Sequence, residues 1–218
     1  MRVVIAGGHG KIALLLEQLL AGRGDQAVGL IRNPAHVADV QKAGAEAVIC
    51  DLEAASAGDV AVLLSGADAV VFAAGAGAGS GAPRKDTVDR AASALMADAA
   101  ERAGVRRFVQ ISSMGAGQPP RPGSDEVWAA YIAAKTAAEA DLRDRDLDWI
   151  IVRPGGLTDA PATGRIRLAP PPVPRGTIPR ADVAAVIAAL LDNPGTRHQT
   201  LELVSGDSPV AAAVHSVS

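Results

Sequence analysis

Short apolar runs alternate with longer segments of helical periodicity along the first third of the chain. The runs have the length and β-branched character of buried strands, and the segments between them repeat apolar residues every three to four positions. This pattern predicts strands at 2–6, 27–31, 47–50 and 69–72 and helices at 12–20, 34–43 and 58–64. Strands that alternate with helices in this way form a parallel sheet with helices on both faces and right-handed crossovers.

The alternation continues in the second half of the chain. It predicts, in order, a helix at 86–103 ended by Gly104, a strand at 107–112, a proline-rich loop at 114–123, a helix at 125–143 and a strand at 149–152. The last predicted elements are a helix that runs from an Asp182 N-cap to 191 and a strand at 200–204.

The segment 155–180 is rich in proline and glycine, which favours a loop or small lobe over the sheet. Loops of this kind often determine specificity. Together the elements predict a single α/β domain over residues 1–218, a doubly wound parallel sheet with 155–180 as a small C-terminal substrate lobe.

Composition narrows the choice of partners. The 218 residues are 49% hydrophobic with a formal net charge of −3, which leaves no basic surface of the kind that binds nucleic acid. Cys50 is the single cysteine and the four histidines are scattered, so we expect no metal site and a reducing, cytoplasmic setting. The uncharged stretches are too short or too rich in glycine for a membrane helix, and the N-terminal run lacks the features of a signal peptide.

A glycine-rich turn, GGHGKIA, joins the first strand to the first helix. Gly7, Gly8 and Gly10 allow a tight turn and a close approach of the backbone to phosphate, while the free N–H groups and dipole of the helix attract an anion. The spacing is GxxGxxA rather than GxGxxG, and glycine also serves purely structural turns, but the strand–turn–helix context favours a pyrophosphate site. His9 in such a turn is more often a turn residue than a catalyst.

The ends of the second and third strands carry two further candidates. Arg32 follows the second strand, where an acidic residue would bind the ribose hydroxyls of NAD and an arginine can pair with the 2′-phosphate of NADP. This favours NADP over NAD, although Arg32 could also be a solvated surface residue. Asp51 could accept a hydrogen bond from the adenine amino group or cap the next turn.

Tyr131 and Lys135 are four positions apart on a predicted helix, so their side chains share one face. A lysine ammonium beside a phenol favours the phenolate and lets the tyrosine exchange a proton with a carbonyl or an alcohol. Ser112 and Ser113 end the preceding strand at the carboxyl edge of the sheet, where ligands bind in open parallel sheets. A purely packing role for Tyr131 is the alternative.

With these motifs in place, the chain resembles the short-chain dehydrogenase/reductase superfamily, and within it the atypical branch of small NAD(P)-binding, NmrA-like and epimerase-like proteins. The resemblance implies a Rossmann fold, with Ser113, Tyr131 and Lys135 as catalytic residues. It also implies a set of cofactor-binding positions along the chain. These are Gly7, His9, Gly10, Lys11, Ile12, Arg32, Asp51, Leu52, Ala73, Ala74, Gly75, Lys135 and Pro154.

The chain departs from the family pattern at one catalytic position. The fuller catalytic tetrad of the superfamily has an asparagine in the fourth helix, and this chain has asparagine only at 33 and 193. A proton relay through that asparagine is therefore missing.

The leading functional hypothesis is an NADP-dependent oxidoreductase that transfers hydride to a small carbonyl, quinone or flavin substrate. One alternative is a dinucleotide-binding redox sensor without turnover, and another is an enzyme similar to sugar-nucleotide epimerases and dehydratases. In each case we expect a monomer or a homodimer with a small-molecule ligand and no nucleic acid or membrane partner.

Overall fold

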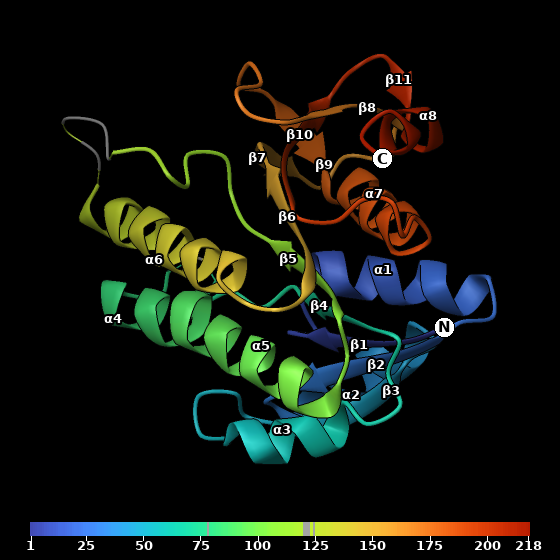
Figure 1. The fold of residues 1–218 in the computed structure, drawn as a ribbon, viewed down its shortest axis with the longest axis vertical. Helices are drawn as coiled ribbons and strands as arrows, with labels where there is room; N and C mark the ends of the chain where they lie inside the picture. Colours follow the sequence, from blue (N-terminus) through green and yellow to red (C-terminus); the bar gives the residue numbers. More distant parts are fainter. Residues whose placement is uncertain (78, 120–122, 124) are drawn as a thin grey trace.

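The computed structural model describes residues 1–77, 79–119, 123 and 125–218. Its centre is a nine-stranded sheet in the order β11-β8-β10-β6-β5-β4-β1-β2-β3, with helices on both faces (Figure 1). Seven neighbouring strands, β3 to β10 in that order, run parallel, and β8 and β11 add antiparallel pairs at one edge. The α/β, doubly wound Rossmann fold is therefore confirmed.

The strands agree closely with the predicted ones. The parallel strands are β1 (Arg2–Ala6), β2 (Gln26–Ile31), β3 (Glu46–Ile49), β4 (Ala69–Phe72), β5 (Arg107–Ile111), β6 (Asp148–Pro154) and β10 (Gln199–Ser205). β1 and β4 are almost wholly apolar and buried on both faces, as central parallel strands require.

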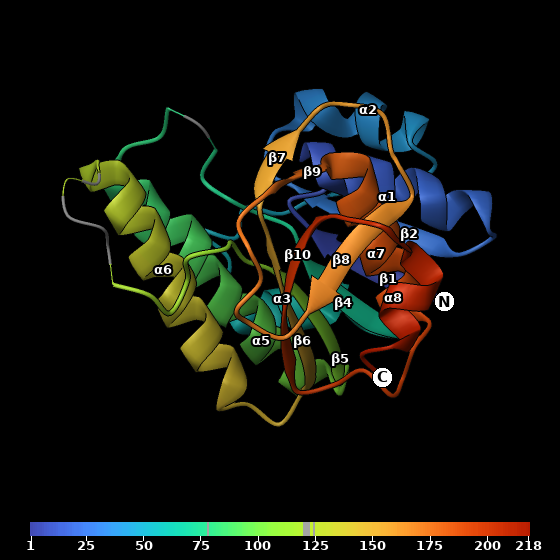
Figure 2. The ribbon, with the colours of Figure 1, turned by 90° about the horizontal axis from the view of Figure 1, so that it is seen from above.

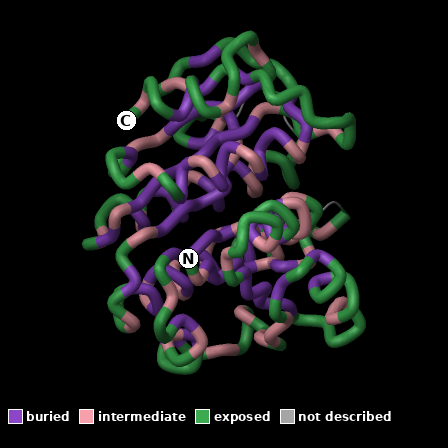
Figure 3. The backbone as a smooth tube through the Cα atoms, turned by 90° about the vertical axis from the view of Figure 1, so that its right-hand side faces the viewer, coloured by how far each residue is buried: buried purple, intermediate pink, exposed green. Residues whose placement is uncertain are grey.

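Two layers of helices enclose the sheet. One face is covered by α1 (Lys11–Gly22), α2 (Val37–Lys42) and α7 (Arg180–Leu191), and the other by α3 (Ala57–Leu63), α5 (Ala92–Ala103) and α6 (Glu126–Arg143). The buried segments lie between these two layers (Figure 3). A short 3-10 turn, η1 (Pro34–His36), precedes α2, and α8 (Val210–His215) lies against β8 near the C-terminus.

The predicted helix at 86–103 is three joined segments. α4 (Ala82–Arg84) leads into a π-helical stretch, η2 (Lys85–Ala91), which continues as α5. Gly104 ends α5 with a φ of 71°, as predicted. Wider π turns change which side chains face inward, and they are frequent at functional sites.

The segment 155–180, predicted as a loop or small lobe over the sheet, contains strands that the prediction did not include. The segment contains β7 (Gly156–Thr158), β8 (Arg165–Ala169) and β9 (Thr177–Pro179), and β8 pairs antiparallel with β10 in the main sheet. The buried Ile166 and Leu168 of β8 alternate with exposed arginines, a strand pattern hidden by the prolines on either side. β7 and β9 pair with each other in a separate two-stranded sheet (Figure 2), and β11 (Ser208–Pro209) pairs with β8.

The prediction that Asp182 is an N-cap was wrong, because α7 begins at Arg180 after Pro179. The fully buried Asp182 carboxylate accepts 2.9 Å hydrogen bonds from the backbone N–H groups of Thr163 and Gly164. It therefore anchors the turn before β8. Part of the predicted loop at 114–123, residues 120–122, lies outside the described residues, and none of the helices in the described part is long and apolar enough to cross a membrane.

One core position breaks the apolar pattern of α1. Glu17 is fully buried, and neither of its carboxyl oxygens has a hydrogen-bond partner among the described residues. It fits because Gly29 on β2 has no side chain: a Cβ there would lie 2.6 Å from Glu17 Oε1. Burial raises the pKa of Glu17 from its usual 4.5 to about 8.

We predict that Glu17 makes the protein less stable as the pH rises from about 4.5 to 8. In this window the unfolded chain has an ionised Glu17 while the folded protein keeps the proton, so each rise in pH favours the unfolded state. Glu17→Gln should remove this slope and unfold at higher urea than the natural protein at pH 8, by on the order of 3 kcal/mol. Urea titrations at several pH values measure this, with the exposed Glu46→Gln as the control. The prediction would be contradicted if the free energy of unfolding changed with pH in the same way in the natural protein and in Glu17→Gln.

Candidate functional site

The turn between β1 and α1 is built by close backbone contacts. Gly7 has a φ of +78°, and a Cβ there would lie 2.6 Å from the Cα of Ala74. A Cβ on Gly8 would lie 2.6 Å from the Cα of Gly29. The Gly10 N–H donates to the Gly7 carbonyl at 2.8 Å, and no side chain caps the start of α1. The first N–H groups of α1 are thus free to bind an anion.

A cavity of about 500 Å³, which we call the turn cavity, opens at this turn. It brings together nine of the positions expected to bind the cofactor, from the glycine turn and from the ends of β2, β3 and β4. These are Gly7, His9, Gly10, Arg32, Asp51, Leu52, Ala73, Ala74 and Gly75. Free helix N–H groups and a wall that admits no Cβ fit the pyrophosphate of a dinucleotide.

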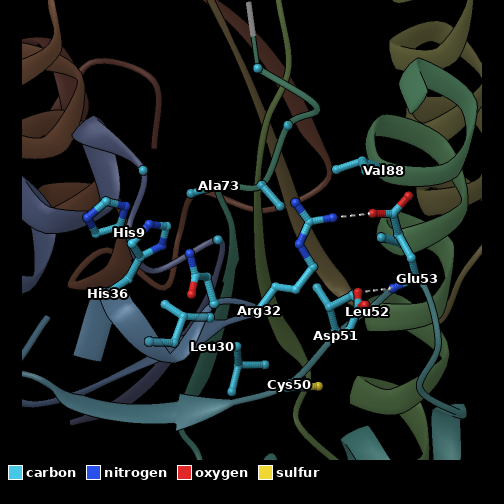
Figure 4. Close-up of a pocket in the computed structure, with 18 of the residues that line it drawn as sticks. His9, Leu30, Arg32, His36, Cys50, Asp51, Leu52, Glu53, Ala73 and Val88 are labelled. Carbon is cyan, nitrogen blue, oxygen red and sulfur yellow. Dashed lines mark hydrogen bonds and ion pairs between the residues drawn. The ribbon is translucent and has the colours of Figure 1, made fainter. Parts of the chain in front are cut away.

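Arg32 projects into the turn cavity, but it is paired with a residue that the sequence analysis missed. Its guanidinium lies 2.8 Å from Glu53 (Figure 4). Glu53 also binds Arg84 at 2.7 Å and accepts a hydrogen bond from the Thr87 hydroxyl at 2.6 Å. The hydrogen bond from Thr87 and the charge of Arg84 lower the pKa of Glu53. Two arginines thus share the Glu53 carboxylate at the wall of this cavity.

The side chains of His9 and Asp51 both make contacts with protein groups in the wall of the turn cavity. The imidazole of His9 stacks on His36 with 3.5 Å between ring centroids and lies 2.8 Å from Asp39 (Figure 4). The Asp51 side chain accepts a hydrogen bond from the Glu53 N–H at 3.1 Å, so it shapes its own turn. Both observations fit the structural roles that the sequence left open.

A second cavity of about 660 Å³, the tyrosine cavity, adjoins the first. The two share a wall formed by residues 73–75 and Gly77, after β4. The tyrosine cavity is lined by Tyr131, Lys135 and Ser113, so the structure brings the three predicted catalytic residues together. Ile12 lines it as well.

Lys135 is held by a carboxylate that the sequence analysis did not identify. Its ammonium lies 3.1 Å from Asp89 Oδ1 and donates to the Ile111 carbonyl at 3.1 Å, 5.8 Å from the centroid of the Tyr131 ring. Lys135 is 3% exposed and Asp89 1%. Asp89 lies on η2, in the helical segment after β4, where the expected asparagine is missing. It lies on the same buried face as Val88, Ala92 and Ser93, and the sequence gave no signal that this carboxylate would meet Lys135.

The two serines after β5 have different surroundings. The Ser112 hydroxyl is buried and donates to Glu139 at 2.5 Å, and Glu139 also binds Arg153. The Ser113 hydroxyl makes only a long 3.4 Å contact with the Met114 carbonyl. Ser113 is therefore the one with a hydroxyl available to a ligand.

Two expected cofactor positions lie outside both cavities. Pro154 ends β6 and is buried, while the residues after it, Gly155 and Leu157, line the tyrosine cavity. Lys11 lies 2.6 Å from Asp159, which also pairs with Arg180 at 2.6 Å. No cluster of metal ligands occurs among the residues that the structure describes.

Comparison with known proteins agrees with this geometry. A model of an NAD(P)H-binding family matches residues 7–194. The chain belongs to this NAD(P)H-binding family. It is 34% identical over 215 residues to the uncharacterized sugar epimerase YhfK of Bacillus subtilis, across 98% of this chain and 99% of that protein.

Solved structures extend the similarity. A Bacillus halodurans protein named as an NAD-dependent epimerase/dehydratase matches with a TM-score of 0.91 and 33% identity, over 99% of both chains. The oxidoreductase ylbE from Lactococcus lactis matches with a TM-score of 0.86 and 27% identity, over 100% of this chain and 96% of that one. The atypical short-chain dehydrogenase/reductase character of the chain is thereby confirmed.

We predict that Gly10→Val abolishes dinucleotide binding and leaves the protein folded. Gly10 has a φ of −65°, which valine tolerates, and its Cβ would lie 3.1 Å from the Gly7 carbonyl. The two further γ-methyl groups would crowd the anion site in front of α1. Calorimetric titration with NADPH tests this, with Gly22→Ala at the far end of α1 as the control. A folded Gly10→Val protein with unchanged affinity would show that the turn is only structural.

Proposed function

We propose that the protein is an NADP-dependent oxidoreductase that reduces a small carbonyl, quinone or flavin substrate in the tyrosine cavity. The observation that carries this proposal is the assembly of Tyr131, Lys135, Asp89 and Ser113 in a cavity that shares a wall with the turn cavity. Residues of the turn cavity would hold the pyrophosphate and adenosine of the cofactor, and the wall shared by the two cavities would hold its nicotinamide end. The bound cofactor would supply hydride to the substrate carbon.

The residues of the chain supply the proton and the positioning. Ser113 donates a hydrogen bond that orients the substrate oxygen. Tyr131 gives its phenolic proton to that oxygen as the carbonyl carbon accepts hydride. The ammonium of Lys135 stabilises the resulting phenolate, which regains its proton from solvent. Asp89 fixes the ammonium in place through their 3.1 Å contact, and so acts as a positioning residue.

A second candidate is epimerase chemistry, because the Bacillus subtilis relative is named a sugar epimerase. In that case hydride returns to the same substrate and no NADPH is consumed. Net oxidation of NADPH, followed at 340 nm with a panel of carbonyls, quinones and flavins, separates the two. Cofactor binding without any turnover would instead favour the redox sensor.

We predict that Tyr131→Phe binds NADPH normally but lowers turnover by about a hundredfold to ten-thousandfold, the usual value of a positioned acid. Lys135→Met should weaken NADPH binding and lower turnover, because it removes a cofactor contact as well as the charge beside the phenolate. Calorimetry gives the affinity and initial rates give the turnover. Full activity in Tyr131→Phe would mean that the reaction needs only hydride transfer, as flavin reduction does.

We predict tighter binding of NADPH than of NADH, through Arg32 and Arg84. Arg32→Ala should weaken NADPH binding about tenfold to a hundredfold, as expected for the loss of a charge-assisted hydrogen bond of about 1.5–3 kcal/mol, with little effect on NADH. Glu53→Gln should strengthen NADPH binding, because Glu53 competes with the 2′-phosphate for both arginines. Paired titrations with both cofactors measure this. Equal affinity of the natural protein for NADPH and NADH would overturn the assignment of NADP.

A further inference from the structure

The tyrosine cavity contains a buried cation that the proposed proton transfer does not use. Lys85 is 8% exposed and lies on η2, one π-helical turn before Asp89. Its ammonium lines the cavity, donates to the Gly77 carbonyl at 2.9 Å and lies 5.4 Å from the centroid of the Tyr131 ring. Lys135 has Asp89 as its partner, but Lys85 forms no ion pair with any carboxylate of the described residues.

A buried ammonium without a counter-ion is costly, because one carbonyl replaces little of its hydration. The other charges of the cavity do not remove the imbalance. Asp89 forms its ion pair with Lys135, and Arg180 forms one with Asp159. Asp125 lies exposed at the start of α6. An anion bound in the cavity would supply the missing partner.

The rim of the same cavity is apolar. Seven large hydrophobic side chains are exposed among the described residues, and three of them line this one cavity: Val127, Trp128 and Leu157. Trp128 is 46% exposed, and its ring lies 5.4 Å from that of Tyr131. Exposed apolar groups gathered from α6 and β7 around one opening are typical of a ligand site.

We propose that the tyrosine cavity binds an aromatic or apolar organic anion, with Lys85 as its counter-ion and Val127, Trp128 and Leu157 around its apolar body. This rests on the proposed function, since the anion would be the substrate of that reaction. The position of Lys85 over the Tyr131 ring places the ligand's negative charge near the oxygen that accepts the proton. Neutral carbonyl compounds of the same shape would then be poor substrates.

The test compares two probes of nearly the same shape, 2-naphthoate and its neutral amide, 2-naphthamide. Calorimetric titrations at low salt, with and without saturating NADPH, should show naphthoate binding at least about tenfold more tightly. Lys85→Met should remove this advantage and leave naphthamide within about twofold, while Lys85→Arg should keep most of it. Trp128→Ala should weaken both probes alike, and Lys42→Met, an exposed lysine on α2, should change neither.

Each other outcome overturns the proposal. Equal affinity for the two probes, no binding of either at millimolar concentration, or an equal loss of both in a folded Lys85→Met protein would show that Lys85 is structural. A loss of NADPH affinity in Lys85→Met with no change for naphthoate would place Lys85 at the cofactor instead. Because naphthoate is titrated without cofactor as well, a failure of the oxidoreductase proposal, seen as absent NADPH binding or turnover, is distinguishable from a failure of the anion site.

Discussion

The close approach of backbones at Gly7 and Gly8 is the constraint on which the rest of the structure depends. A Cβ at either position would meet a neighbouring backbone atom at 2.6 Å, from Ala74 after β4 on one side and from Gly29 of β2 on the other. β1 pairs with both of these strands, so the start of α1 lies where the chain order in the sheet reverses. Crevices form at such points, at the carboxyl ends of parallel strands. Both cavities open there.

Four buried ionisable side chains lie around this crevice. Lys85, Asp89 and Lys135 are nearly inaccessible, and Glu17 lies beneath the glycine turn. Burying such groups costs stability unless they are paired, and an apolar core of the same volume would generally be more stable. Glu139, Arg153, Asp182 and Glu202 are buried as well, but each is hydrogen-bonded to a neighbour. Lys85 is different because it has no ion-pair partner among the described residues, and such a cost in stability is typical of functional sites.

The sequence predicted the parts of the fold that depend on local pattern. Parallel strands are continuous apolar runs, and the glycine turn, Arg32 and the pair Tyr131 and Lys135 are readable from spacing alone. What it missed depends on contacts between distant segments. Asp89 of η2 meets Lys135 of α6, Glu53 meets Arg32 across two loops, and the Asp182 carboxylate binds N–H groups of the turn at 163–164. β8 was hidden because the prolines on either side of it favour a loop, although its arginines alternate with the buried Ile166 and Leu168.

The two cavities are built from different parts of the chain, and this difference bears on the choice between an enzyme and a sensor. The turn cavity is made largely from the first half of the chain, which a protein that only bound dinucleotide would also need. The tyrosine cavity draws on η2, α6 and the residues after β5 and β6, and these elements place Tyr131, two lysines and Ser113 around one space. Dinucleotide binding alone gives no reason to bury an unpaired Lys85. Reduction of a bound anion would give a role to both lysines, since Lys85 would neutralise the ligand and Lys135 would stabilise the phenolate.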